Sequence, residues 1–370
     1  LHRHSLAVAL TGLAVILGYK LLFGSLDVVA HFAHEWVVLV NLFLLLLGFA
    51  LLARHFERSA IADALPRLLP AGWKGGVALL AIVFVMSAFL DNIAAAIIGA
   101  TMASAVFRGK LHVGYLAAIV AAANAGGSGS VLGDTTTTMI WLDGHSPLSV
   151  LHAYVAAVPA FFAFAIIAAR QQQKFSPIVR DANERVEIDL ARIIIVVLIL
   201  AGAVAANIYA STLPDERGVQ FPYIGATIVG VLLLLTPWRR PDWSAVPAAA
   251  RGAVFLLSLV LSASMMPVEG LPPASPLTTL GLGYVSAVFD NIPLTKLALE
   301  QGGYDWGALA YAVGFGGSML WFGSSAGVAV ANLFPDAKSV GNWLREGWHV
   351  AVGYAVGFLA LLALVGWRPS

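Results

Sequence analysis

Three aspartates lie inside strongly apolar stretches of the chain. Asp91 and Asp290 each precede an asparagine, which is Asn92 in one case and Asn291 in the other. Asp134 follows a glycine-rich segment. A carboxylate at the depth of a bilayer is costly unless it is paired, protonated or bound to a cation. Because a proton and a cation can each neutralise a carboxylate, these aspartates predict a site that exchanges one for the other.

Side chains that bear oxygen surround the aspartates. Hard cations such as sodium favour oxygen ligands, and unwound backbone at the glycine pairs 126–127 and 316–317 can add carbonyl ligands. We therefore expect an ion- or substrate-binding set of Asp91, Asn92, Asn124, Ser128, Ser130, Asp134, Thr135, Asp290, Asn291, Ser318, Ser324 and Ser325. Within this set, sodium is expected at Asp91, Asn92, Asp134 and Asn291.

One basic residue, Lys296, follows Asp290 by six positions. A buried ion pair between the two is expected, either as a structural contact or as one that opens during transport. The chain has no Cys and no H-E-x-x-H motif, which argues against a thiolate site, a disulfide framework or a bound zinc. No cofactor is predicted, and sodium is expected only as a transported ligand.

The composition predicts the environment of these residues. Of 370 residues, 59% are apolar and 11% are charged, and the mean hydropathy is +0.85. A soluble domain carries about 25% charged residues. The chain is therefore expected to be an all-α polytopic protein in a lipid bilayer, which excludes soluble enzymes and nucleic-acid binders.

The apolar stretches fall into three kinds. Residues 112–141 and 304–331 carry polar residues in their middles and predict broken transmembrane helices. Residues 75–107 and 276–301 have apolar arms too short to span, so they predict re-entrant hairpins with the Asp-Asn pairs at their tips. Plain stretches long enough to cross about 30 Å of hydrocarbon are residues 5–23, 36–53, 148–169, 191–210, 222–236, 252–268 and 349–367.

The distribution of basic residues predicts the orientation. With both hairpins returning to the side they left, 17 Lys and Arg residues fall on one side of the membrane and 3 on the other, with Lys296 inside a hairpin. Cytoplasmic loops collect such residues. This predicts nine crossings, a cytoplasmic N-terminus and an external C-terminus, in a bacterial inner membrane.

The two hairpins belong to an internal repeat. Residues 89–93 (FLDNI) match residues 288–292 (VFDNI), and Gly-Gly-Ser follows at 126–128 and at 316–318. In this register Asp134 falls on Ser324. Five predicted crossings separate the hairpins, so the repeat is expected to be inverted. We expect a first repeat at 1–169, a cytoplasmic linker at 170–192 and a second repeat at 193–370. The second copy has one more preceding span, so an equal count would place a further helix before Leu1.

The motifs resemble a known transporter family. Residues 123–128 (ANAGGS), 133–141 (GDTTTTMIW), 290–293 (DNIP), 316–320 (GGSML) and 323–329 (GSSAGVA) are similar to those of the NhaD-type sodium/proton antiporters, in the superfamily of the arsenite permeases and divalent-anion symporters. The resemblance implies exchange of sodium or lithium for protons, and no enzyme activity. It also implies a homodimer whose protomers each have a scaffold part and a transport part that moves as an elevator.

Other functions fit the sequence less well than sodium/proton exchange. The main alternative is a sodium-coupled or uniport transporter of a small anion, either a di- or tricarboxylate or arsenite, on the same fold. The related symporters usually carry Ser-Asn-Thr at the hairpin tips, and Asp-Asn-Ile here favours cations and protons. Residues 323–327 fit the G-x-S-x-G motif of hydrolases but lack its strand-to-helix context. A passive channel would need no inverted hairpins.

Overall fold

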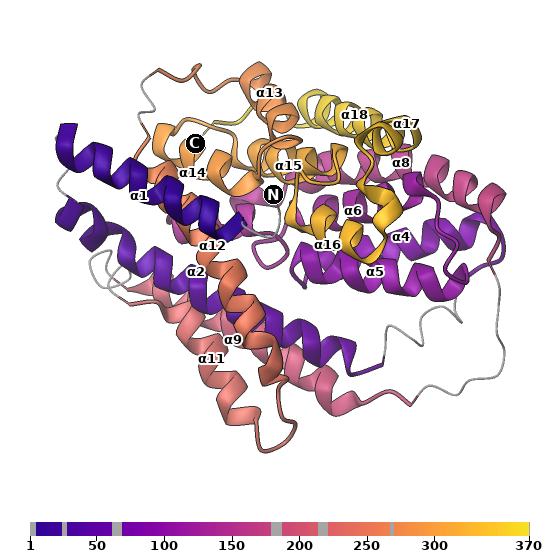
Figure 1. Cartoon of the computed structure of the whole chain (residues 1–370), viewed down its shortest axis with the longest axis horizontal. Coiled ribbons are helices and arrows are strands. Elements are labelled where there is room, and N and C mark those ends of the chain that lie inside the picture. Colours follow the sequence, from indigo (N-terminus) through magenta and orange to yellow (C-terminus); the bar gives the residue numbers. More distant parts are fainter. Residues whose placement is uncertain are drawn as a thin grey trace. The chain divides into compact units, whose positions relative to one another are not determined.

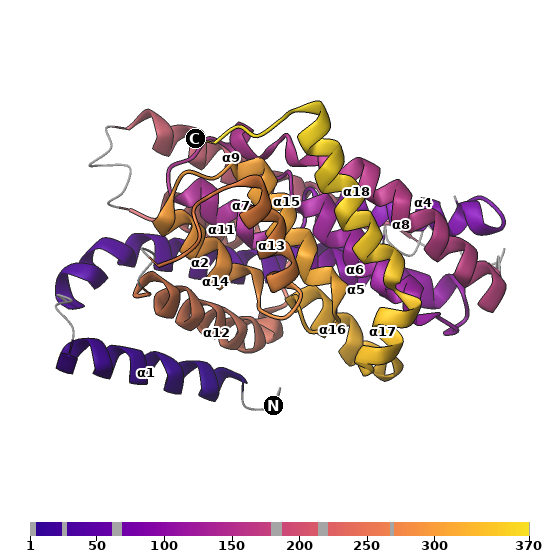
Figure 2. The ribbon, with the colours of Figure 1, turned by 90° about the horizontal axis from the view of Figure 1, so that it is seen from above.

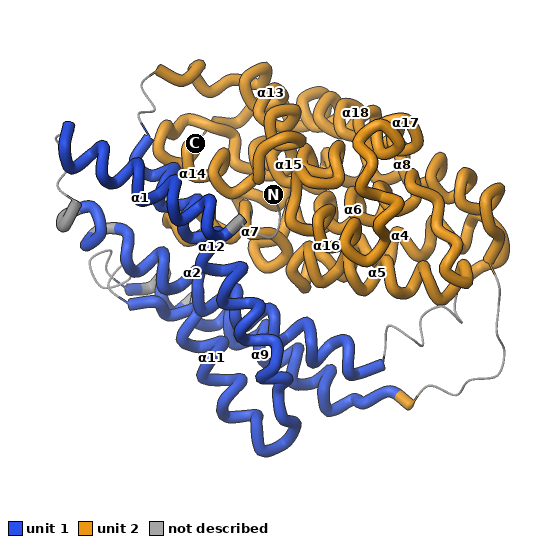
Figure 3. Tube along the Cα trace, viewed as in Figure 1, with its two compact units in different colours: residues 1–61, 188–267 blue, residues 62–187, 268–370 orange. Residues whose placement is uncertain are grey.

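The computed structural model describes residues 5–23, 28–60, 69–178, 187–213, 221–266 and 270–369. These residues form helices and connecting loops, with no strand among them. The chain divides into two compact units (Figure 3). Unit 1 comprises Leu1–Ile61 and Ile188–Pro267, and unit 2 comprises Ala62–Glu187 and Val268–Ser370. The predicted all-α class is confirmed.

Unit 1 is built from apolar helices of different lengths. They are α1 (Ser5–Phe23), α2 (Val28–Glu57), α9 (Leu190–Thr212), α11 (Tyr223–Leu235) and α12 (Val246–Ser264). Helix α2 packs against α9, α11 and α12, and α1 packs against α12 (Figure 1). The buried Asn41 side chain accepts a hydrogen bond from the Gly225 amide at 2.7 Å, which fixes α2 against the start of α11.

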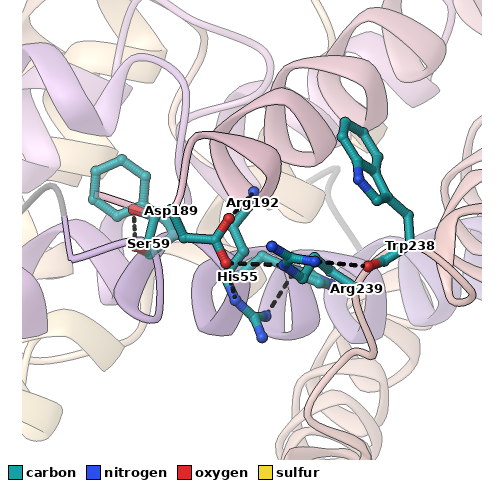
Figure 4. A network of polar contacts seen from close by, with 7 residues as sticks. His55, Ser59, Asp189, Arg192, Trp238 and Arg239 are labelled. Carbon is teal, nitrogen blue, oxygen red and sulfur yellow. Dashed lines mark hydrogen bonds and ion pairs between the residues drawn. The ribbon is translucent and has the colours of Figure 1, made fainter. Parts of the chain in front are cut away.

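Polar contacts join the end of α2 to the start of α9 (Figure 4). The Asp189 amide donates to the Ser59 carbonyl at 3.0 Å, and Arg239 Nε donates to Asp189 Oδ2 at 3.0 Å. Arg192 Nη1 lies 3.2 Å from His55 Nδ1. The hydrogen bond from Arg239 is the main cause that lowers the pKa of Asp189, with the charge of Arg192 adding to it. The Asp189 carboxylate therefore stays ionised and pairs with Arg239 and Arg192, while the Asp189 amide makes the contact to the end of α2.

Unit 2 contains two series of helices in the same order. The first series is α4 (Trp73–Ser87), α5 (Asn92–Val106), α6 (Val113–Gly127), α7 (Thr135–Leu142) and α8 (Ala153–Phe175). The second is α13 (Pro276–Ser286), α14 (Asn291–Gln301), α15 (Trp306–Gly316), α16 (Ser325–Leu333), the short α17 (Val340–Glu346) and α18 (Trp348–Leu364). Helix α15 lies beside α13, α8 and α18 (Figure 2). The helices of both series lie within or close to the predicted residue ranges, and the re-entrant hairpins, broken transmembrane helices and inverted repeat stay predictions.

Glycines make the same close contacts in both series. Gly126 lies against the carbonyl of Phe84, and Gly316 lies against the carbonyl of Gly283, so a Cβ at either glycine would collide with backbone. The two contacts correspond, because each glycine opens a Gly-Gly-Ser and each carbonyl lies seven residues before a hairpin aspartate. Close approach of the hairpin to the broken helix thus explains the repeated glycines.

Four helices among the described residues are long and apolar enough to cross a membrane. They are Leu6–Phe23, Glu35–Glu57, Pro147–Phe175 and Trp243–Ser264, and the pair α17 and α18, bent by 58°, is a fifth candidate. Several predicted spans are shorter apolar helices, including Leu190–Ala206 and Tyr223–Leu235. These helices are consistent with a polytopic membrane protein. The number of nine crossings stays a prediction.

The compact units divide the chain differently from the repeat. Each unit takes one segment from the first predicted repeat and another from the second, and the predicted linker is divided between the units after Glu187. Residues 179–186 of the predicted linker 170–192 lie outside the described residues. Unit 1 holds α1, α2, α9, α11 and α12, and unit 2 holds the residues of both predicted hairpins and both predicted broken helices.

Candidate functional site

The hairpin aspartates cap the helices that follow them. Asp91 Oδ2 accepts a hydrogen bond from the Ile93 amide at 3.2 Å, and Asp290 Oδ1 accepts one from the Ile292 amide at 3.1 Å. Aspartate is a preferred N-cap because its carboxylate satisfies a free amide of the first turn. The caps make Asn92 and Asn291 the first residues of α5 and α14, where both asparagines are buried.

The Asp134 carboxylate accepts hydrogen bonds from the side chains of both of these asparagines. It is 2% exposed and lies where the backbone between α6 and α7 is unwound. Asn92 Nδ2 donates to Asp134 Oδ1 at 2.9 Å, and Asn291 Nδ2 lies 3.4 Å from the same oxygen. The tips of the two hairpins therefore meet at one carboxylate oxygen.

Asn124 extends the cluster to the second broken helix. Its Oδ1 accepts from Asn92 Nδ2 at 3.0 Å. Its Nδ2 donates to Ser318 Oγ at 2.9 Å and to Ser324 Oγ at 3.2 Å. All of these side chains are buried. The polar cluster thus joins α5 and α14 to both broken helices.

The other carboxylate oxygen of Asp134, Oδ2, is the atom that could bind an ion. Asp134 Oδ2 is buried and accepts no hydrogen bond from any residue that the structure describes. A buried carboxylate oxygen without a partner is unfavourable, so a bound cation or proton would stabilise it. The side chains that interact with Asp134 are the neutral amides of Asn92 and Asn291 and the Thr136 hydroxyl, and one positive charge would balance the carboxylate.

The remaining predicted residues mostly hold backbone in place. Ser128 Oγ donates to the Ala125 carbonyl at 2.8 Å, and Ser130 Oγ donates to the Ala88 carbonyl at 2.6 Å. Ser325 Oγ lies 3.4 Å from Asp290 Oδ2, and Thr135 is buried at the start of α7. The hydroxyls of Ser128 and Ser130 are therefore bonded to backbone carbonyls and not to Asp134.

Lys296 pairs with an acidic residue of its own helix. Lys296 Nζ forms an ion pair with Glu300 Oε1 at 2.8 Å, while Asp290 accepts from Ile292 and Ser325. Residues four apart share one face of a helix, whereas residues six apart are about 120° apart around it. The helix geometry therefore favours Glu300 over Asp290 as the partner of Lys296.

Thr136 contacts the polar cluster, although the predicted set of site residues does not include it. Its Oγ1 accepts from Asn291 Nδ2 at 2.9 Å. It lies in a run of four threonines, and the neighbours Thr137 and Thr138 turn their hydroxyls to the carbonyls of residues 130, 131 and 134. Composition alone does not distinguish these threonines, since the helical position of each decides its partner.

The sequence of the chain is similar to those of several known proteins. No family model matches the chain. It is 27% identical over 323 residues to sodium/proton antiporter 1 of Arabidopsis thaliana, covering 76% of this chain and 54% of that protein. It is 26% identical over 323 residues to the Na(+)/H(+) antiporter NhaD of Vibrio parahaemolyticus, covering 74% of this chain and 76% of that protein. The chain thus spans about half the length of the Arabidopsis relative.

A further relative is the Na(+)/H(+) antiporter NhaD of Alkalimonas amylolytica. It is 26% identical over 342 residues, which cover 77% of this chain and 67% of that protein. The resemblance to NhaD-type antiporters predicted from the motifs is confirmed by these similarities. All three names describe transporters rather than enzymes.

Proposed function

We propose that the chain is a secondary active transporter that exchanges sodium or lithium for protons across a membrane. The observation that carries the proposal is the buried Asp134 Oδ2, which lies in a cluster of amides and hydroxyls and accepts no hydrogen bond from the described residues. Similarity to proteins named sodium/proton antiporters supports it.

The proposed exchange follows from the two oxygens of Asp134. The asparagines at the hairpin tips hold Oδ1, which leaves Oδ2 to bind a sodium ion or a proton. Either ion neutralises the carboxylate, and a nearby positive charge disfavours protonation. The two ions therefore compete for one site. Release of a proton on one side of the membrane would be linked to uptake of sodium on that side.

We further propose an elevator mechanism in a homodimer. Unit 2 would be the moving transport part, since it holds the site, both hairpins and both broken helices. Unit 1 would be the scaffold and would carry the dimer contact. The repeated helix order and the matching glycine contacts support an inverted repeat, with the hairpin at 75–107 opening to the cytoplasm and that at 276–301 to the outside.

The function is tested by ion flux in proteoliposomes. A sodium or lithium gradient is expected to drive proton movement that a pH-sensitive dye inside the vesicles records. Citrate and arsenite, tested in parallel, are expected to have no effect and not to be taken up. Sodium-stimulated uptake of either anion would contradict the proposal and favour the anion transporter.

The orientation is tested by thiol labelling, because the chain has no Cys. Lys110→Cys lies in an exposed turn after α5 and is expected to resist an impermeant thiol reagent added to intact bacterial cells. Asp143→Cys lies at the exposed end of α7, on the predicted external side, and is expected to react. Permeabilised cells should label both. Labelling of the residue 110 variant alone in intact cells would reverse the proposed topology.

A further inference from the structure

Gly314 of α15 lies directly beside the free oxygen of Asp134. A Cβ built on Gly314 would be 2.9 Å from Asp134 Oδ2 and 4.0 Å from the Cβ of Ser128. The first distance is shorter than a normal contact between a carbon and an oxygen. Asp134 Oδ2 therefore points at the place that a side chain at position 314 would occupy.

The internal repeat identifies the counterpart of Gly314. Asn124 and Gly314 each lie two residues before a Gly-Gly-Ser. The amide of Asn124 donates to Ser318 and Ser324. In the repeat register these serines correspond to Ser128 and Asp134, the two residues that a Cβ at 314 would approach. The two halves of the cluster are built alike, except that an amide fills one and glycine leaves the other without a side chain.

The backbone at Gly314 is held firmly. At the start of α15, Asp305 Oδ1 accepts from the Ala308 amide at 2.9 Å and lies 2.6 Å from His152 Nε2. One turn before Gly314, the Tyr311 hydroxyl donates to the Tyr354 carbonyl at 2.9 Å. Two residues after it, Gly316 lies against the carbonyl of Gly283. Helix α15 therefore cannot withdraw easily to make room for a larger group.

We propose that Gly314 is a specificity-determining position, whose missing side chain forms the half-site in which a monovalent cation contacts Asp134 Oδ2. The backbone of α15 then limits the size of the ion that fits. This inference rests on the proposed function, because it assigns the ion specificity of the same site. Cavity size is one of the properties by which oxygen sites distinguish cations.

The test measures ion binding by thermal unfolding of the purified full chain in detergent. A ligand that binds only the folded state raises the unfolding midpoint. Sodium and lithium chloride are titrated at constant ionic strength, with choline chloride as the reference salt. Gly314→Ala adds one methyl group beside Asp134 Oδ2, so sodium affinity is expected to fall about tenfold more than the affinity for the smaller lithium ion. The matched control is Gly281→Ala in α13, where a Cβ meets nothing within 4 Å and no change is expected.

A second variant separates blocking of the site from damage to the fold. Gly314→Asn supplies the amide that Asn124 supplies in the other half, and this amide can donate to Asp134 Oδ2. The variant is expected to unfold below the wild-type midpoint in choline chloride, because its side chain overfills the space beside Asp134 Oδ2, and to lose its response to both sodium and lithium. Gly281→Asn is expected to keep both responses.

The possible results distinguish this inference from the proposed function. Equal losses of sodium and lithium affinity in Gly314→Ala, or a preserved sodium response in Gly314→Asn, would each overturn the role of Gly314. If the wild type responds to both ions and the Gly314 variants respond equally well, only this inference fails. If the wild type responds to neither ion, the proposed function fails and the inference fails with it.

Discussion

Asp134→Asn is expected to reduce sodium-driven proton exchange to the level of protein-free liposomes. An asparagine has the shape of aspartate, and its Oδ1 can still accept from Asn92 and Asn291, so the hairpin tips should stay in place. Its amide nitrogen can neither bind a cation nor carry a transferable proton. The variant should therefore fold normally and lose both transported ions at once.

Ser324→Ala changes the corresponding position of the second copy and is expected to do much less. Its hydroxyl accepts from Asn124 and from the Gly327 amide, so the variant loses neutral hydrogen bonds of about 1 kcal/mol each, or about a fivefold effect apiece. Exchange rates in proteoliposomes would be compared at equal protein density. Asp143→Asn, at an exposed position, is the control for removal of a carboxylate. Equal losses from Asp134→Asn and Ser324→Ala would mean that both copies share the cation evenly.

This asymmetry was visible in the sequence, since Asp134 falls on Ser324 in the repeat register. The positions of the hairpin tips were also predictable, because an Asp-Asn pair between two short apolar arms leaves few other places for a turn. The structure begins α5 and α14 at these asparagines.

The division of labour among the aspartates was not predictable from spacing. Asp91 and Asp290 turn a carboxylate oxygen to the backbone of their own helices, while Asp134, also at an N-cap position, makes no capping hydrogen bond. An aspartate before a helix can cap it or face a partner from another segment, and the packing of that segment decides. Here Asn92 and Asn291 compete successfully for Asp134 Oδ1.

The contribution of Gly314 was hidden for a related reason. A sequence search for ligands looks for side chains that bear oxygen, and glycine has none. Only the alignment of Asn124 with Gly314, together with the direction of Asp134 Oδ2, shows that a missing side chain can define a site. The internal repeat likewise did not predict the division into compact units, because helices far apart in the sequence pack together in each unit.

Competition between sodium and protons has the second large expected effect, a shift in apparent sodium affinity with pH. Below the pKa of the Asp134 carboxyl, each unit of falling pH raises the proton concentration tenfold. The sodium concentration at half-saturation should then rise up to about tenfold per pH unit for one displaced proton, with the maximum signal unchanged. Above that pKa the carboxyl is ionised without sodium, so the midpoint should become independent of pH. Sodium-binding isotherms at several pH values measure both regimes.

Asp134→Asn provides the control for this titration, because any sodium response that survives in it comes from another group. Asp91 and Asp290 are each engaged by a backbone amide of the following helix, and Ser325 also approaches Asp290. A pH-dependent sodium response retained in Asp134→Asn would therefore move the exchange site to the hairpin caps. In the wild type, a midpoint that is constant from about pH 6 to 9, together with sodium-stimulated uptake of an organic anion, would replace the antiporter with the anion symporter. If only the maximum signal changes with pH and the midpoint is constant, protons act on a separate group, and one-site competition at Asp134 is excluded.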